Sequence, residues 1–131
     1  MRYFKFGILM LGGLLILFNC RNKTTQSIQL ISTEEMREIS KLEGMQLVDV
    51  RTPREYEIGH IPNAQNIDFL DAKFELNIQN LDKSKPVIIY CQRGSRSAKC
   101  ASKLIANGFV KVYDLDGGFA QWEYSGLEVE N

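Results

Sequence analysis

The residues best suited to chemistry in this sequence lie in one short segment, where a cysteine is followed by two arginines and a glycine. Cys91 comes directly after an apolar run, and Arg93, Gly94 and Arg96 follow within five positions. The thiolate is the nucleophilic form of a cysteine, and nearby cations or a helix N-terminus lower its pKa below the usual value of about 8.5. A cysteine that only fills core space does not require such surroundings. The segment therefore predicts a reactive thiolate at Cys91.

The same segment is suited to holding an anion. We expect the short loop after Cys91 to curl so that its backbone N–H groups point at the sulfur atom, with a helix beginning just past Arg96. The guanidinium groups of Arg93 and Arg96 would add to the positive field, and Gly94 allows a positive φ or the close approach of a ligand. An anionic sulfur donor is therefore a suitable substrate.

The elements that position this loop follow an alternating order. Short apolar runs alternate with helical patterns, which is typical of βαβ units around a parallel sheet. The expected strands are 28–31, 47–50, 65–67, 87–90 and 110–115, and the expected helices follow Ser32, begin at Pro53, fall within 68–81, cover 97–107 and include Trp122. Ser32 with Glu35 forms a capping-box pattern, and Thr52 is the expected cap before Pro53. Cys91 then lies at the C-terminal end of a parallel strand, where α/β folds bind ligands.

Five segments, taken in order, resemble the successive signatures of the rhodanese family. They are residues 47–51, 55–56, 59–64, 91–97 and 116–119 together with Trp122, and the resemblance covers about residues 28–127. It implies a single α/β domain of rhodanese type, with a parallel five-stranded sheet flanked by helices. It also implies a sulfurtransferase in which Cys91 takes a sulfane sulfur from a donor such as thiosulfate as a persulfide and passes it to a thiol or small nucleophile. The residues that would cradle the persulfide and bind substrate are Gln92, Arg93, Gly94, Ser95 and Arg96.

Loop length separates this chemistry from phosphate chemistry. Related phosphatases and arsenate reductases use a loop one residue longer, which accommodates a tetrahedral oxyanion. Four residues separate Cys91 from Arg96, the spacing associated with sulfur transfer. The phosphatase alternative rests on fold analogy and is disfavoured by this spacing.

Two further alternatives stay open. One is a rhodanese-like module without enzymatic activity that binds a partner or senses sulfide. The other is a thiol–disulfide oxidoreductase in which Cys100 resolves Cys91. Cys100 lies in an alanine-rich helical pattern that favours packing, and a disulfide needs Cα atoms within about 7 Å.

Three other polar residues match recurrent positions of the family. His60 is the only histidine, so a Cys–His pair of protease type would require it beside Cys91. It lies in a turn before a proline, which favours a structural hydrogen bond. Asp49 and Arg51 could frame the mouth of the pocket, or pair with each other and with loop backbone; we favour the second role.

The N-terminus has the pattern of an export signal. Arg2 and Lys5 form a basic start, and residues 6–18 form an uncharged apolar run. Such a run covers roughly 20 Å as a helix, less than the ~30 Å of a bilayer core, so residues 1–19 are interpreted as a signal peptide.

The end of this run resembles the lipid-modification site of bacterial lipoproteins. Cys20 stands at the boundary, and Leu17 occupies the expected leucine position. An ordinary signal peptide or short anchor with an incidental cysteine is the alternative. We expect a lipidated Cys20, a polar tether over 20–27 and a folded domain over 28–131. The protein would then be exported and anchored to a membrane by its N-terminal lipid, facing the periplasm or the cell exterior.

Composition limits the other possibilities. The chain has 131 residues, enough for one domain, with 16 basic and 16 acidic residues. Removing residues 1–19 removes Arg2 and Lys5 and leaves 14 basic against 16 acidic residues, a net charge of −2. No basic excess indicates nucleic acid as a partner, and no metal or cofactor motif is present in the sequence.

Overall fold

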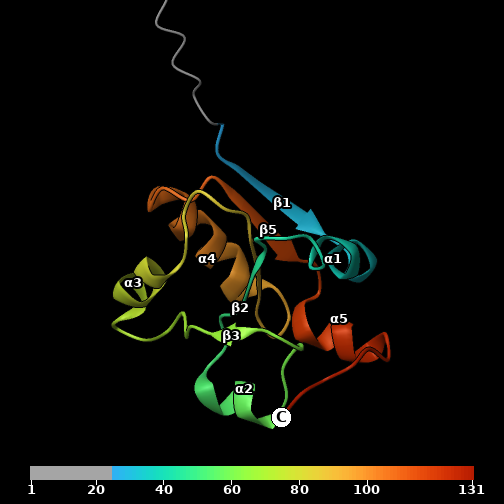
Figure 1. Cartoon of the computed structure of the whole chain (residues 1–131). Coiled ribbons are helices and arrows are strands. Elements are labelled where there is room, and N and C mark those ends of the chain that lie inside the picture. The colour runs from blue at the N-terminus through green and yellow to red at the C-terminus, as the bar shows by residue number, and fades with distance from the viewer. Residues whose placement is uncertain (1–24) are drawn as a thin grey trace, which may run out of the picture.

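A computed structural model describes residues 25–131, in which helices cover both faces of a parallel sheet (Figure 1). The strands are β1 (Ser27–Ile31), β2 (Gln46–Asp49), β3 (Gln65–Asn66), β4 (Val87–Tyr90) and β5 (Lys111–Leu115), in the spatial order β1-β5-β4-β2-β3. The helices are α1 (Thr33–Ile39), α2 (Pro53–Ile58), α3 (Phe74–Asn77), the 3-10 turn η1 (Ile78–Asn80), α4 (Ser95–Ala106) and α5 (Gly118–Tyr124). The predicted fold class, a single α/β domain with a five-stranded parallel sheet, is confirmed.

The predicted signal peptide and Cys20 lie outside the described residues. Within residues 25–131, none of the helices combines the length and the apolar character that crossing a membrane requires.

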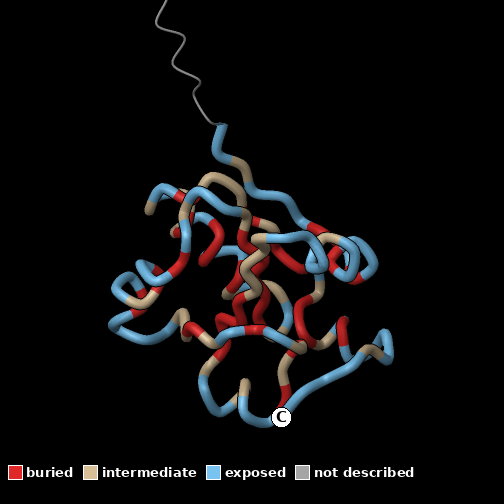
Figure 2. Tube along the Cα trace, viewed as in Figure 1, coloured by how far each residue is buried: buried red, intermediate tan, exposed pale blue. Residues whose placement is uncertain are grey.

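The core consists of two apolar layers separated by the sheet. Val87 and Ile89 of β4 face the layer formed with α3, η1 and α4, whereas Ile88 and Tyr90 face the layer formed with α1 and α5. Figure 2 shows the buried residues gathered along the central strands, with exposed residues on the peripheral loops and helices. Because β4 is covered on both faces, its sequence is a continuous apolar run.

Capping residues fix where two helices begin. The side chains of Ser32 and Thr52 each accept a hydrogen bond from the backbone N–H three residues later. The side chains of Glu35 and Glu55 in turn accept a hydrogen bond from the backbone N–H of the capping residue. The capping box predicted at Ser32 and the cap predicted at Thr52 are therefore confirmed. Each box pairs otherwise unsatisfied N–H groups at the helix start.

The start of α4 differs from the sequence expectation. The helix begins at Ser95, two residues before the predicted Ser97, and Gly94 is its N-cap with φ of 115°. A residue with a side chain would be strained in this left-handed conformation, whereas glycine adopts it readily. The earlier start brings Ser95 and Arg96 into the first turn of the helix.

Candidate active site

Cys91 follows the last residue of β4 and is 1% exposed. Its Sγ accepts a hydrogen bond from the backbone N–H of Gly94 over 3.1 Å and lies 3.5 Å from Ser97 Oγ. The hydroxyl of Ser97 in turn donates to the carbonyl oxygen of Gly94 over 3.2 Å. The loop therefore curls around the sulfur atom, as the sequence predicts.

The pKa of the Cys91 thiol is below its usual value as the balance of opposed effects. Burial raises the pKa, but hydrogen bonding with the Ser97 hydroxyl and with the backbone N–H groups of Ser97, Gly94 and Arg93 together lowers it further than burial raises it. Hydrogen bonds to a charged form favour that form. A lowered pKa agrees with the predicted thiolate. The lowering comes from Ser97 and from the backbone N–H groups of the loop.

The two arginines of the loop differ in their surroundings. Arg96 donates two hydrogen bonds of 2.7 Å to the carboxylate of Glu55 in α2. Hydrogen bonding from Arg96 lowers the pKa of Glu55 to about 2. The charge of Arg96 is thus shared with Glu55, a partner that the sequence analysis did not assign to it. Arg93 is exposed and forms no ion pair with any of residues 25–131.

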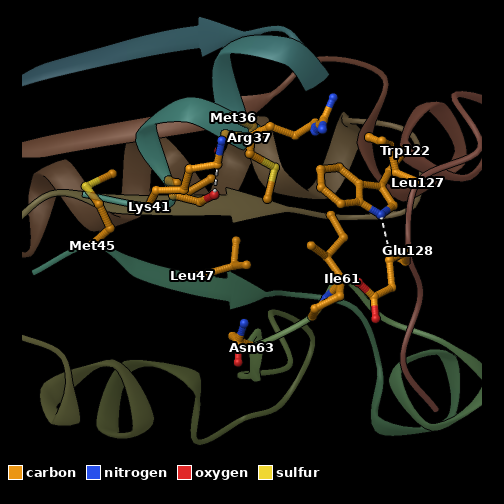
Figure 3. A pocket seen from close by; sticks show the side chains of 13 residues that line it. Met36, Arg37, Lys41, Met45, Leu47, Ile61, Asn63, Trp122, Leu127 and Glu128 are labelled. Carbon is orange, nitrogen blue, oxygen red and sulfur yellow. Dashed lines mark hydrogen bonds between the residues drawn. The ribbon is translucent and has the colours of Figure 1, made fainter. Parts of the chain in front are cut away.

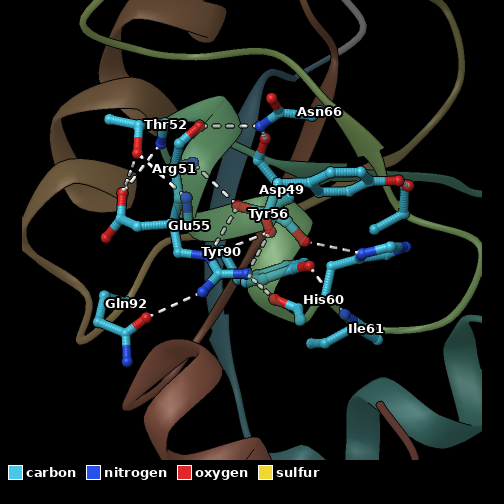
Figure 4. Close-up of polar contacts among 12 residues, drawn as sticks. Asp49, Arg51, Thr52, Glu55, Tyr56, His60, Ile61, Asn66, Tyr90 and Gln92 are labelled. Atoms are coloured by element: carbon cyan, nitrogen blue, oxygen red, sulfur yellow. Dashed lines mark hydrogen bonds and ion pairs between the residues drawn. The ribbon is translucent and has the colours of Figure 1, made fainter. Parts of the chain in front are cut away.

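A buried ion pair supports the loop from the neighbouring strand. Arg51 is 2% exposed and lies 2.7 Å from the Asp49 carboxylate, and its guanidinium also donates to the carbonyl oxygen of Gly59. A further N–H of Arg51 donates over 2.9 Å to Oε1 of Gln92, the residue that directly follows Cys91 (Figure 4). The guanidinium also lies 4.0 Å from the ring centroid of Phe119. The pairing favoured in the sequence analysis is present, and it connects β2, the reactive loop and α5.

His60 makes structural contacts away from the sulfur atom. Its Nδ1 lies 3.0 Å from the carbonyl oxygen of Tyr56, and the two rings stack with centroids 3.7 Å apart. Its Nε2 lies 3.6 Å from the carboxylate of Glu130. The structural hydrogen bond that we favoured for His60 is confirmed.

The start of α5 packs directly on the reactive loop, which the sequence analysis did not predict. The backbone N–H groups of Phe119 and Ala120 donate to the carbonyl oxygens of Cys91 and Gln92 over 2.8 and 3.0 Å. A Cβ on Gly118 would lie 2.5 Å from Cys91 O, so only glycine permits this approach. The adjacent glycines Gly117 and Gly118 were the sequence signal for this close contact. By occupying the loop carbonyls, α5 leaves the loop N–H groups directed toward the sulfur.

Ser97 is a second residue that sequence reasoning did not assign to the site. It is fully buried in α4 and contacts the sulfur atom. A serine in the first turn of α4, on the inward face of the helix, was the only sequence signal for it.

Cys100 lies in the interior of α4 and is 1% exposed. It belongs to the same apolar cluster as Cys91, and both thiols are free. Burial, followed by the charges of Asp114 and Cys91, raises the pKa of Cys100 to about 12. The packing role predicted for Cys100 agrees with this environment.

A separate cavity of about 370 Å³ lies on the other face of the sheet (Figure 3). Met36, Leu47, Ile61, Ile88 and Trp122 are among its lining residues, and Cys91 is not. Cys91 and its loop therefore lie outside this cavity. No group of three or more potential metal ligands occurs in the described part of the chain.

Comparison with known proteins places these features in a family. Residues 32–125 match the family described as Rhodanese-like domain. Thiosulfate sulfurtransferase GlpE of Pseudomonas putida is 38% identical over 93 residues, which are 70% of this chain and 82% of that protein. The uncharacterized protein YqhL of Bacillus subtilis is 46% identical over 77 residues, which are 59% of this chain and 60% of that protein. The crystal structure of a rhodanese-like domain protein from Staphylococcus aureus superimposes with a TM-score of 0.66 at 34% identity, covering 79% of this chain and 99% of that one.

Proposed function

Since the chain belongs to the rhodanese-like domain family, we propose that it is a sulfurtransferase whose Cys91 carries sulfur as a persulfide. The proposal rests on one observation: the Cys91 sulfur is buried beside backbone N–H donors, and the pKa of its thiol is lowered. The sulfurtransferase name of the relatives from Pseudomonas putida and Coxiella burnetii supports the same reaction class.

In the loading step, the Cys91 thiolate attacks the sulfane sulfur of a donor such as thiosulfate. A sulfur–sulfur bond forms at Cys91 while the bond within the donor breaks, and its electron pair leaves with sulfite. The loop residues Gln92 to Arg96 would hold the anionic outer sulfur through their N–H groups, as they hold the thiolate.

In the unloading step, a thiolate or another small nucleophile attacks the outer sulfur. The electron pair of the persulfide bond returns to Cys91, which is stabilised as a thiolate by the same donors. A leaving thiol of low pKa departs more readily, so the environment that activates Cys91 for loading also favours unloading.

Mass spectrometry of the purified protein after incubation with thiosulfate tests the proposal. We expect the Cys91 peptide to gain the mass of one sulfur atom, and to lose it when cyanide or a thiol is added. A Cys91→Ser variant serves as the control and should gain nothing. An unmodified Cys91 after exposure to several sulfane-sulfur donors would favour the non-enzymatic binding or sensing module instead.

The redox alternative lacks a specific observation in its favour. A resolving thiol has to ionise before it attacks, and the raised pKa of Cys100 opposes this. We therefore retain sulfur transfer as the proposed function, with a lipid anchor at Cys20 as the proposed connection to the membrane.

A further inference from the structure

The cavity on the face of the sheet away from Cys91 has no part in the proposed reaction. Its volume of about 370 Å³ falls within the range of roughly 300–1,000 Å³ that is usual for small-molecule sites. Residues from α1, from the turn after α2, from the central strands and from the C-terminal segment line it (Figure 3). It is therefore a second candidate binding site, separate from the reactive loop.

The floor of the cavity is apolar. Its deepest lining residues are at most 7% exposed and belong to the apolar layer that α1 and α5 form with the sheet; they are Met36, Ile61, Ile88 and Trp122. Leu47 lines the same cavity but is only partly buried, so a ligand there would remove further apolar surface from water. Because burying such surface is favourable, the floor suits the apolar body of a ligand.

Hydrogen bonds hold the wall that the C-terminal segment contributes. Trp122 Nε1 donates to the carbonyl oxygen of Glu128 over 2.7 Å. Two residues further along, the backbone of Glu130 exchanges hydrogen bonds of 2.8 and 2.9 Å with the backbone of His60. The cavity is thus formed without a ligand. The indole N–H of Trp122 is already satisfied, so the body of a ligand needs no acceptor for it.

The charged residues of the α1 segment are divided between two sides. Arg37 and Lys41, four residues apart, line the cavity. The acidic residues line a separate hollow beside β1 and β5; they are Glu34, Glu35 and Glu38. Arg37 is exposed and forms no ion pair with any of residues 25–131. Lys41 pairs with Glu38, but both side chains are exposed, and such pairs are weak.

Among the described residues that line the cavity, Glu128 is the only acidic one. In Figure 3 it lies at the end with Trp122, whereas Lys41 lies with Met45 at the other end. The lining therefore carries two positive charges and one negative charge. This balance favours a ligand with a negative head group beside α1.

We propose that the cavity binds a medium-chain fatty carboxylate, with its head group at Arg37 and Lys41 and its chain over Trp122. A guanidinium can donate two parallel hydrogen bonds to a carboxylate. Met36 and Met45 line the cavity, and their flexible thioether side chains adapt to the shape of a chain. This binding does not depend on sulfur transfer, because Cys91 lies outside the cavity.

Tryptophan fluorescence tests the proposal, since Trp122 is the only tryptophan of the sequence and lines the cavity. Titration of the full chain with decanoate, kept below its micelle-forming concentration, should change this fluorescence until the site is saturated. Decyltrimethylammonium has the same chain and a positive head group. We expect it to bind about fivefold more weakly than decanoate, or weaker still.

Variants separate the contribution of the charge from that of the apolar floor. Arg37→Gln should weaken decanoate binding by about fivefold and leave decanol binding unchanged, because only the charge is lost. Lys99→Gln is the matched control, since Lys99 is exposed on α4, forms no ion pair with the described residues and does not line the cavity. Leu47→Phe should weaken both ligands, because the larger ring occupies the apolar space.

The rate of Cys91 alkylation, which should match that of the unmodified protein, checks that each variant is folded. If Leu47→Phe does not fold, the comparison of Arg37→Gln with Lys99→Gln decides alone. The absence of a saturable change in Trp122 fluorescence would overturn the proposal, as would equal effects of these two variants on decanoate binding.

Equal affinities for decanoate and decyltrimethylammonium would also overturn the proposal, because the cavity would then have no preference for an anion. A dimer in sedimentation equilibrium that Leu47→Phe abolishes would assign the cavity to a second copy of the chain instead. None of these measurements uses a sulfur donor, so failure of this inference and failure of the proposed sulfur transfer are separate results.

Discussion

The two cysteines of the domain differ in environment although both are buried. Cys91 accepts a hydrogen bond from a loop N–H and lies beside Ser97, whereas Cys100 lies in the interior of α4 with a raised pKa. Burial alone raises a thiol pKa, so the donors around Cys91 decide its reactivity. The difference is therefore one of hydrogen-bond donors.

This difference predicts separate effects of replacing each cysteine. Cys91→Ser should abolish persulfide formation, while Cys100→Ser should keep most of it. The second change places a hydroxyl in an apolar cluster and should lower the free energy of unfolding by about 1–3 kcal/mol. At about pH 6, a limiting thiol reagent should label Cys91 first, because more of it is ionised. Loss of turnover in Cys100→Ser while the Cys91 persulfide still forms would identify Cys100 as a resolving thiol.

At the scale of elements, three segments distant in sequence meet at the reactive loop. The end of β2 supplies the Asp49–Arg51 pair, α2 supplies Glu55, and the start of α5 supplies N–H donors to the loop carbonyls. These contacts involve the side chains of Gln92 and Arg96 and the backbone carbonyl oxygens of Cys91 and Gln92. The close approach of α5 at Gly118 is the tightest of them, because it places backbone against backbone.

Gly118→Ala should disrupt this contact. The new Cβ would lie 2.5 Å from Cys91 O and 2.9 Å from the carbonyl group of Gln92, at a φ of +60°. We expect a loss of about 2–4 kcal/mol in the free energy of unfolding and a lower rate of sulfur transfer. Urea unfolding and persulfide formation measure the two effects.

Gly126→Ala is the matched control for this change. Its φ is +69°, and a Cβ there would meet nothing within 4 Å. Only the backbone strain, about 1 kcal/mol, should appear, with sulfur transfer unchanged. Equal losses in the two variants would mean that backbone conformation, and not the contact with the loop, sets the effect at Gly118.

At the scale of the whole molecule, the Glu55–Arg96 pair connects α2 to the first turn of α4. Hydrogen bonding from Arg96 lowers the pKa of Glu55 from 4.5 to about 2. A carboxyl group whose pKa is lower in the folded state stabilises the fold above its unfolded pKa, and this contribution is lost as the pH falls through the folded pKa. The pair is partly exposed, so its contribution is about 1 kcal/mol.

Glu55→Gln should therefore lower the free energy of unfolding at neutral pH, by an amount that shrinks as the pH falls from about 5 to 2. Chemical unfolding at several pH values measures the difference from the unmodified protein. Glu57→Gln is the control, since Glu57 is exposed on the same helix and forms no ion pair with the described residues. A difference that stays constant down to pH 2 would contradict the assigned cause.

The expected attachment of the protein to a membrane is predicted from its N-terminal sequence. We expect the mature protein to begin at Cys20 and to carry lipid, because the apolar run ends there with Leu17 three residues before it. Intact-mass measurement on protein from its native membrane checks this, with a Cys20→Ser variant as the control that should lose the lipid mass. Cleavage elsewhere would remove the anchor and leave the sulfur chemistry untouched.

The sequence by itself determined the order of strands and helices, the capping box at Ser32, the cap at Thr52 and the position of Cys91 at the end of a buried strand. These features depend on local periodicity and on contacts between residues a few positions apart, so they can be predicted from the chain. The fold class followed because alternating strands and helices have few ways to bury both faces of a sheet.

Only the tertiary structure decided how the reactive loop is held. The docking of α5 through Gly118 and the sharing of Arg96 with Glu55 both join segments far apart in sequence. Hydrogen-bond partners across such distances depend on strand register and helix packing, which no local pattern specifies. For the same reason the start of α4 was predicted two residues late, because the left-handed conformation of Gly94 depends on how the loop closes around the sulfur.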